Sequence, residues 1–479
     1  MYREKKQISI FEEAKNFRGA ELDSGNRWVK LSEMIPWEEI ERKYKAAFSA
    51  TRGRPAKLAR IALGSHLIKE KFCLSDRETV ELIGENPYLQ FFLGMERFEP
   101  KAPFDASMMI WFRKRLTPEM IADVNEYVIR GDKKNDRNDA DGGNGGASGP
   151  ASGEGGAAET NKGTMIVDAT CVPSDIRFPT DAALLAEARE MTEKIIDRLH
   201  RERGIGKKPR TYRRKARKEY LRFARNRNPR KSEIRKAIRK QLSYLRRNLL
   251  AIEKMGAAEP LPEALKARLA VIKSLYGQQS EMYAEKKHSV ADRIVSLHSP
   301  WVRPIIRGKA NAPVEFGAKV AISMVDGYAM VERLSWNAFN ETTTLIDTIE
   351  RYRAREGVYP ERILADKIYR TRETLSYCKK HGIRMSGPKL GRPPADKNEY
   401  YKQCLLAKAE AGERNAIEGE FGTGKRRYNL NRLTARLQGS GETQIHLIFL
   451  SMNLWKKLRA FFAQFLEWIF LALKRPVIV

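Results

Sequence analysis

The sequence contains few of the residues that build covalent or histidine-based sites. Its four cysteines, Cys73, Cys171, Cys378 and Cys404, lie far apart among 479 residues, with no C-x-x-C pair. This spacing predicts neither a disulfide framework nor a cysteine zinc site, and it suits a reducing cytoplasm. The six histidines are scattered with no pair four residues apart. Histidine-based metal or nucleophile chemistry is therefore poorly supported.

Long apolar runs are also missing. No stretch reaches the roughly 18 uncharged apolar residues of a membrane span. The nearest candidate, residues 461–473, is too short and contains Glu467. The first residues, MYREKKQISIFEEAKN, are charged and lack the apolar core of a secretion signal. We therefore expect a cytoplasmic protein with no membrane partner.

Acidic residues are fewer than basic residues. The chain has 60 Asp and Glu against 90 Lys and Arg, a formal charge of +30. With 42% hydrophobic residues, wholesale disorder is excluded, and the length suits about two to four domains. Cations that neutralise phosphates gain affinity by releasing counterions, so the charge predicts a polyanionic partner, with nucleic acid the first candidate.

Composition divides the chain into segments. Residues 131–163 hold ten of the 33 glycines and no aromatic or large aliphatic residue, which predicts a flexible linker. Residues 1–130 show apolar residues at helical spacing, and Ser75 with Glu78 three residues later matches a capping box. This pattern predicts a small all-α DNA-binding domain. Residues 451–479 are expected to form an apolar C-terminal helical tail.

Residues 164–450 combine strand and helix patterns. Met165–Val167 resembles a buried strand that ends at Asp168, and two β-rich runs flank Asp326-Gly327, a hairpin turn pair. Helix, strand, helix, strand and a final helix follow. The order predicts an α/β domain with a mixed sheet and helices on its faces.

A long insertion, at about residues 184–291, is helical and strongly basic. Residues 201–250 alone contain 21 Lys and Arg against three Glu. Apolar residues recur every three or four positions from Ile234 to Ile252, which leaves the arginines on the remaining surface. A solvated helical face is one interpretation, but single-sign charge at this density repels itself unless an anion binds. We expect phosphate contacts from Arg213, Arg214, Lys215, Arg217 and Lys218.

Two aspartates occupy comparable places. Asp168 follows the first strand, and Asp366 follows the predicted strand 362–365. The ends of strands are where α/β sheets present functional groups. Hard divalent cations prefer oxygen ligands, and two such ions promote phosphoryl transfer. A metal site of this kind requires a third carboxylate in addition to the two aspartates.

The best candidate for that carboxylate is Glu418. Arg414 precedes it by four residues and Lys425 follows by seven, so a helix would place all three on one face. There the acid would bind metal while the cations contact phosphate. Glu420 is the competing acid, but it lies two positions on and would point away from Arg414.

These residues give the sequence a resemblance to the DDE insertion-sequence transposases, whose signature is Arg, three residues, Glu, six residues and Lys. Arg414, Glu418 and Lys425 fit that spacing. LSDRETVELIGENPYLQFFLG and FDASMMIWFRKRL resemble the N-terminal transposase domain, while SWNAFNE and ADKIYRTRETLSYCKKHGIR resemble the catalytic domain. Related members carry a Tyr three residues before the Arg, where this chain has Ala411.

The resemblance implies an RNase H-like fold in which Asp168, Asp366 and Glu418 hold two Mg²⁺ ions, with Mn²⁺ as an alternative. Water and then a freed 3′-hydroxyl would attack phosphodiesters. The implied partners are the terminal inverted repeats, the target DNA and a second copy of the chain on paired ends, at the nucleoid. In this class Trp336 would stack on a displaced base, with a core position as the alternative. Arg307 and Lys309 would contact DNA from a strand edge.

The sequence leaves room for three rival interpretations. Gly419, Gly424 and Lys425 match most of a phosphate-binding loop, but Arg426 stands where Ser or Thr must bind Mg²⁺, and a charged helix precedes the motif, so no nucleotide cofactor is expected. A DNA-binding relic without catalysis would tolerate loss of an acid. A nuclease on the same sheet would hydrolyse DNA without joining strands.

Overall fold

The computed structural model groups the chain into two compact units. A core unit comprises residues 1–172, 319–335 and 339–479, and an insertion unit comprises residues 173–318 and 336–338. Within them the structure describes residues 14–46, 48, 56–139, 160–203, 207–256, 261–309, 312–387 and 396–473. No helix among these described residues combines the length and apolar character needed to cross a bilayer.

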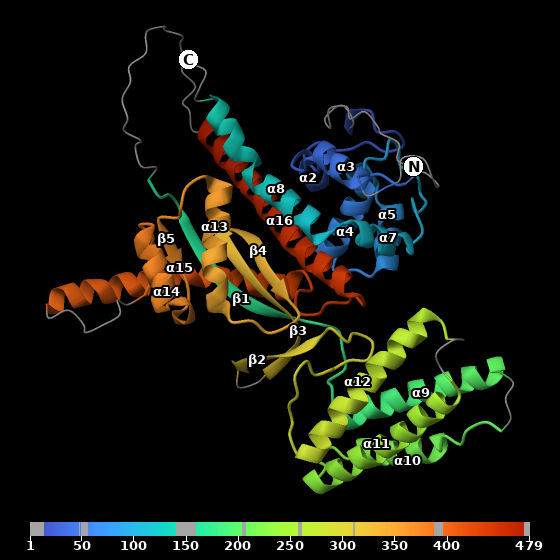
Figure 1. Cartoon of the computed structure of the whole chain (residues 1–479). Helices are drawn as coiled ribbons and strands as arrows, with labels where there is room; N and C mark the ends of the chain where they lie inside the picture. Colours follow the sequence, from blue (N-terminus) through green and yellow to red (C-terminus); the bar gives the residue numbers. More distant parts are fainter. Residues whose placement is uncertain are drawn as a thin grey trace, which may run out of the picture. The chain divides into compact units, whose positions relative to one another are not determined.

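Seven helices of the described N-terminal part precede the sheet (Figure 1). They are α2 (Arg27–Glu33), α3 (Trp37–Lys45), α4 (Ala59–Phe72), α5 (Asp76–Glu85), α6 (Pro87–Phe92), α7 (Met108–Arg115) and α8 (Pro118–Asp139). The predicted capping box is confirmed, since Ser75 and Glu78 cap α5 reciprocally. The predicted linker start is wrong, because α8 continues through residues 131–139. The remainder of that prediction, residues 140–159, lies outside the described residues.

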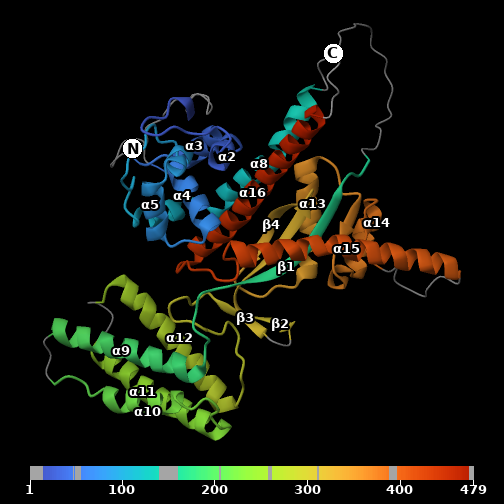
Figure 2. The ribbon, with the colours of Figure 1, turned by 180° about the vertical axis from the view of Figure 1, so that it is seen from behind.

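The C-terminal helix α16 (Gln438–Leu473) belongs to the same unit and runs alongside α8 (Figures 1 and 2). The buried Asn453 amide donates to Asn125 of α8 at 2.8 Å and to the Ala329 carbonyl at 2.7 Å. Trp455 packs edge to face on Trp28 of α2, with ring centroids 5.3 Å apart. The boundary expected at residue 450 therefore falls inside one continuous helix, because residues 451–458 complete the core.

The sheet is mixed, as predicted. Its strand order is β2-β3-β1-β5-β6, with β4 paired to β3. The β5 strand is parallel to β1 and to β6, while β3 is antiparallel to β2 and β4. The strands are β1 (Thr164–Pro173), β2 (Arg303–Lys309), β3 (Ala312–Val325), β4 (Tyr328–Ser335), β5 (Arg362–Leu364) and β6 (Arg384–Met385).

The turn between β3 and β4 matches the sequence prediction. Val325 pairs with Tyr328, so the loop is two residues long. Asp326 and Gly327 have φ values of 51° and 82°. Positive φ at both positions is what a type I′ hairpin turn requires, and an Asp-Gly pair supplies it at low steric cost.

Helices cover both faces of the sheet. Between β4 and the C-terminal helix lie η1 (Glu341–Thr344), α13 (Leu345–Glu356), η2 (Lys367–Tyr369), α14 (Arg372–Lys380) and α15 (Lys397–Arg427). Met165, Val167 and Ile363 pack with residues of α13 and α14 in one hydrophobic cluster. Side chains alternate along a strand, so Asp168 points to the opposite face, across which α15 runs (Figure 2).

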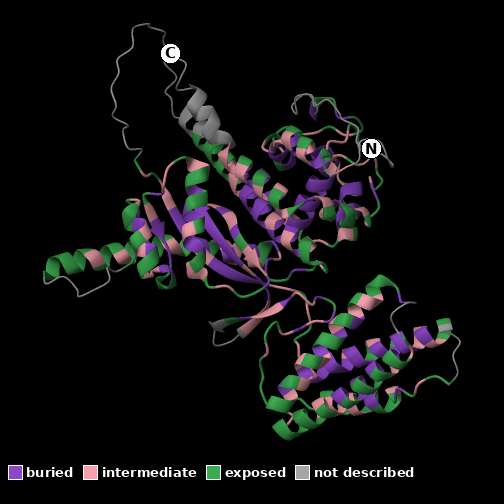
Figure 3. Cartoon of the chain, viewed as in Figure 1, coloured by how far each residue is buried: buried purple, intermediate pink, exposed green. Residues whose placement is uncertain are grey.

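The insertion unit contains a helical bundle with its own core. Its helices are α9 (Asp181–Arg203), α10 (Arg213–Ala224), α11 (Lys231–Lys254) and α12 (Glu263–Glu285). Figure 3 shows their inner faces buried and their outer faces exposed. The predicted apolar face of α11 is confirmed from Leu242 to Ile252, which join the bundle core. Ile234 differs, being 37% exposed, because it lies in the mainly charged first turns of the helix.

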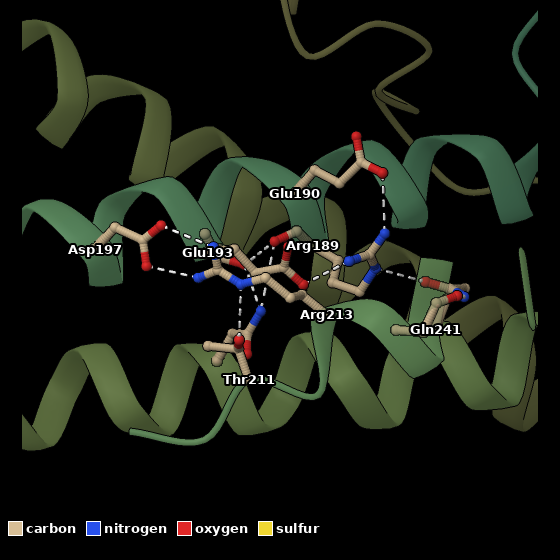
Figure 4. A network of polar contacts seen from close by, with 10 residues as sticks. Arg189, Glu190, Glu193, Asp197, Thr211, Arg213 and Gln241 are labelled. Atoms are coloured by element: carbon tan, nitrogen blue, oxygen red, sulfur yellow. Dashed lines mark hydrogen bonds and ion pairs between the residues drawn. The ribbon is translucent and has the colours of Figure 1, made fainter. Parts of the chain in front are cut away.

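A buried polar network joins α9 to its neighbours (Figure 4). Arg189 is fully buried and donates to Gln241 of α11 at 3.1 Å and to Glu190 at 3.0 Å, and it pairs with Glu193. Gln241 in turn donates to the Ala216 carbonyl of α10 at 3.4 Å. Arg189 and Gln241 together link three helices, and Gln241 contacts α10 through a backbone carbonyl.

Candidate active site

Asp168 and Asp366 meet through strand register. Ile166 of β1 pairs with Leu364 of β5, so two further residues along each parallel chain bring Asp168 beside Asp366. Neighbouring strands are about 4.8 Å apart. Asp366 caps η2, accepting the Lys367 N–H at 2.6 Å. The two carboxylates therefore lie at one place on the sheet.

The expectation that Asp168 ends its strand is wrong. The β1 strand continues to Pro173. Ala169, Cys171 and Val172 are buried, and β1 lies between β3 and β5. The segment after the aspartate is therefore apolar and has a partner strand, which keeps it extended. Asp168 is thus held inside a central strand, a more rigid position than a strand end.

The pKa of Asp168 is raised to about 6, mainly by burial, and the nearby charges of Glu341 and Asp366 contribute in the same direction. The Ala169 N–H, which the Asp168 carboxylate accepts at 2.8 Å, and the Arg414 guanidinium act in the opposite direction. The same acids, with burial as the main cause, raise the pKa of Tyr369 well above its usual range. Negative charge is concentrated here, and a bound cation would relieve it.

Glu341 is a fourth acid that sequence reasoning missed. It opens η1 directly after the cap residue Asn340, and it pairs with Lys319 Nζ at 2.9 Å. The neighbouring Thr342 hydroxyl donates to the Ile368 carbonyl at 2.8 Å, which ties η1 to the turn after Asp366. The Asn340 cap was a local signal for this helical turn. The position of Glu341 beside Asp168, however, depends on how the strands pair.

Ion pairs fix how α15 lies over the strands. Arg362 of β5 makes a bidentate contact with Glu413 at 2.7 and 3.1 Å, and Arg384 of β6 pairs with Glu410. One position further, Arg414 Nη1 lies 4.0 Å from Asp168 Oδ2. The buried side chains of α15 follow the same face. This register brings Arg414 of α15 to Asp168.

Glu418 lies one turn beyond Arg414. Its Oε1 is 3.5 Å from Arg414 Nη2, and its side chain is 58% exposed. Glu420 points to another side of the helix, 3.7 Å from Lys456 of α16, as helical spacing predicts. Lys425 lies in the last turn of α15. The two acids therefore have different surroundings, since Glu418 lies beside Arg414 and Glu420 lies beside Lys456 of α16.

The donor chemistry at this place suits a hard divalent cation, because carboxylate oxygens are the available ligands. Asp168 and Asp366 each follow the last register pair, Ile166 and Leu364, by two residues, and the charge of Asp366 acts on Asp168. Within the described ranges, however, no three Asp, Glu, His or Cys side chains converge closely enough to hold an ion. Glu418 would join the two aspartates by turning away from Arg414, a side-chain rotation that its exposure permits.

Comparisons with known proteins identify two matching families and one relative. The family described as "Transposase DDE domain" has a model that matches residues 363–455, and "Transposase domain (DUF772)" matches residues 17–115. An uncharacterized protein, ORF8 of the nfe locus of Rhizobium meliloti, is 33% identical over 163 residues, which are 34% of this chain and 69% of that protein. The chain belongs to the DDE insertion-sequence transposases.

The two matched regions contain different functional elements of this transposase. Residues 363–455 contain Asp366, Arg414, Glu418 and Lys425, while Asp168 precedes the match. Residues 17–115 comprise the helices from α2 to α7. No solved structure matches the chain.

Other residues of the transposase with a predicted role lie elsewhere. Trp336 is 7% exposed and packs edge to face with Trp301, which is the core position given as the alternative to base stacking. Arg307 and Lys309 belong to β2, and their side chains lie outside the described residues. Gly419 to Lys425 lie inside α15. A phosphate-binding loop is therefore excluded at that motif.

One residue predicted to contact phosphate also forms an ion pair within the insertion unit. Arg213 makes a bidentate pair with Asp197, at 2.6 and 2.9 Å, because α9 and the start of α10 lie together (Figure 4). Hydrogen bonds from Arg213 and Lys208 lower the pKa of Asp197 to about 2. Arg213 is therefore occupied in holding α10. Arg214, Lys215, Arg217 and Lys218 of that helix are exposed, as is Arg222 in its last turn.

Proposed function

We propose that this transposase catalyses metal-dependent cleavage and strand transfer of DNA at the terminal repeats of an insertion sequence. The observation that carries the proposal is the proximity of Asp168 on β1 and Asp366 just after the parallel strand β5, beneath a helix that presents Arg414 and Glu418. The paired acids suit metal ligation and the cation suits phosphate. Only the combination suits phosphodiester chemistry.

We further propose that the catalytic domain is RNase H-like. The mixed sheet supports this, with the first acid on its central strand, the second after the adjacent parallel strand and the third on the helix crossing that face. Two Mg²⁺ ions held by Asp168, Asp366 and Glu418 would activate the attacking oxygen and stabilise the leaving one. Arg414 would hold the scissile phosphate near them.

A nuclease without strand transfer is the alternative on the same site. A catalytically inactive relic is less well supported, since all three acids are present in the sequence. The products separate these functions. Supercoiled plasmid carrying the DNA that flanks this gene should be cut at defined ends and then joined, in Mg²⁺ and not in EDTA. Cut ends that are never joined would identify a nuclease.

The N-terminal helices are proposed to bind the terminal repeats. Helix α7 buries Met109 and Phe112 in the core, but leaves Ile110 47% and Trp111 51% exposed. Lys114 Nζ lies 4.7 Å from the Trp111 ring centroid. An exposed aromatic beside cations is typical of nucleic-acid contacts, because the ring packs on sugars or bases while the cation meets phosphate.

Replacing Trp111 with Ala should weaken binding of terminal DNA by about tenfold, since an aromatic contact to a base contributes roughly 1–3 kcal/mol. Tyr127 of α8, which is 45% exposed, provides the matched control, and Tyr127→Ala should bind as wild type does. Fluorescence anisotropy with labelled end DNA measures both. Equal affinities for all three proteins would remove α7 from the interface.

The basic insertion is proposed to bind the DNA backbone. Changing Arg214, Lys215, Arg217 and Lys218 to Gln should lower the slope of log K against log salt by about 0.9 for each phosphate that the variant no longer neutralises. Lys266 and Lys273 on α12 are paired with Glu263 and Glu253, so their Gln variants serve as controls that keep the slope. A slope unchanged by the α10 variant would make the insertion a solvated surface.

A further inference from the structure

Lys71, in the last turn of α4, lies against two aromatic rings. Its Nζ is 4.0 Å from the ring centroid of Trp455 and 5.2 Å from that of Tyr428, and it donates to the Tyr428 hydroxyl at 3.4 Å. Both rings are buried. Trp455 belongs to α16 and Tyr428 directly follows α15. Lys71 therefore lies where the two regions matched by the transposase families meet.

Three exposed arginines surround this lysine. The residues whose positive charges act on the Lys71 ammonium are Arg459, Arg27 and Arg427. The Arg27 guanidinium carbon is 5.7 Å from the Trp455 ring centroid, and Arg459 follows Trp455 by one helical turn. The backbone of Arg427 is held beside α4, because its carbonyl accepts the Cys73 thiol at 3.3 Å. We call Lys71 and the three arginines the cation cluster.

The cation cluster brings positive charges together without a matching acid. Within the described ranges of the chain, no carboxylate forms an ion pair with any of its members. Glu420 acts on Arg459, but it lies 3.7 Å from Lys456, which balances its charge. Burial first, and then the three arginines, lower the pKa of Lys71. Repulsion of this kind is relieved when an anion binds among the cations.

We propose that the cation cluster binds a phosphate group. Guanidinium groups contact phosphate oxygens in pairs, and a lysine adds a compact positive charge. Arg27 and Lys71 belong to the N-terminal helices, while Arg427 and Arg459 belong to the C-terminal part of the core unit, so one bound phosphate would bridge them. Either the DNA backbone or a free polyphosphate such as pyrophosphate would supply the group. The first source rests on the proposed function, and the second is independent of it.

Labelling of the full-length protein with pyridoxal 5′-phosphate tests the site. The aldehyde condenses with an unprotonated lysine amine and releases water, and borohydride then reduces the imine to a stable secondary amine. Mass spectrometry of the peptides should find Lys71 labelled. Pyrophosphate at about ten times its dissociation constant, at constant ionic strength and without metal, should lower this labelling about tenfold. Lys30, which pairs with Glu33 on α2, is the internal control and should show no protection.

A double variant gives a second readout. Arg427→Gln with Arg459→Gln removes two exposed cations and leaves the buried rings in place, and it should raise the dissociation constant of pyrophosphate about tenfold or more in titration calorimetry. The matched control changes two paired cations of α2 and α3, Lys30→Gln and Arg42→Gln, and should bind as wild type does.

The source of the phosphate is found by repeating the labelling with duplex end DNA in EDTA. Protection of Lys71 by DNA, lost in the Arg427→Gln, Arg459→Gln variant, identifies the DNA backbone as the ligand. Protection by pyrophosphate alone identifies a free polyphosphate. If neither protects Lys71, or if the double variant binds both as wild type does, the proposal is wrong and Lys71 is only a cation packed on Trp455. No cleavage is measured, so each result is independent of catalysis.

Discussion

Glu418→Gln should reduce cleavage of terminal DNA by about a thousandfold or more. A neutral amide removes one negative ligand from the proposed metal site, and loss of about 4 kcal/mol of transition-state stabilisation corresponds to that factor. DNA binding should persist, because Arg414 and the basic insertion remain. Single-turnover cleavage at saturating protein separates the two effects.

The matched control is two positions away on the same helix. Glu420 lies 3.7 Å from Lys456 and faces α16 instead of the aspartate pair. Glu420→Gln should therefore cleave as wild type does. If Glu420→Gln lost cleavage and Glu418→Gln retained it, the assignment of the third acid would be wrong. If both variants retained cleavage, Glu341, which lies beside Asp168, would become the candidate for the third acid.

Arg189→Ala should destabilise the insertion bundle by roughly 3–5 kcal/mol, the usual cost of removing one partner from a buried ion pair. Arg189 is fully buried, and its removal leaves Glu193 inside the bundle without its cation (Figure 4). Gln241, which also contacts α10, loses a partner too. Thermal unfolding followed by circular dichroism should show an earlier transition, and DNA binding should weaken with it.

Arg198 provides the comparison for that variant. It pairs with Glu202 one turn away on α9, and its side chain is 43% exposed. Exposed pairs at this spacing contribute about 0.3–0.5 kcal/mol. Arg198→Ala should therefore leave the transition almost unchanged. Equal shifts for the two variants would mean that the buried network does not hold the bundle together.

Features specified by neighbouring residues were predictable from the sequence. The capping box at Ser75 and the turn at Asp326-Gly327 each depend on a few adjacent positions, and both are confirmed. The mixed sheet also followed from the order of short apolar runs and helical patterns. Boundaries set by tertiary contacts were not predictable. The β1 strand passes Asp168 because it has neighbours on both sides, and α16 passes residue 450 because it packs on the N-terminal helices.

The residues of the candidate site also differ in whether neighbouring sequence or tertiary contacts place them. Arg414, Glu418 and Lys425 were found from spacing along one helix, which local sequence specifies. Glu341 was missed, since its partner Lys319 is distant in sequence and the two meet only when β3 and β4 pair. Arg213 was assigned to phosphate because its partner Asp197 lies on the preceding helix. Ion pairs between elements are products of the fold and have no local signature.

Comparison of wild type with Asp366→Asn on the same end DNA, in Mg²⁺, tests the central claim most directly. The substitution keeps the side chain's size and its ability to accept the Lys367 N–H, but removes a negative charge beside Asp168. The account predicts equal DNA binding, with cleavage and joining by wild type only. Cleavage by Asp366→Asn at a rate near that of wild type would contradict it, and so would a wild-type protein that binds these ends and never cuts them.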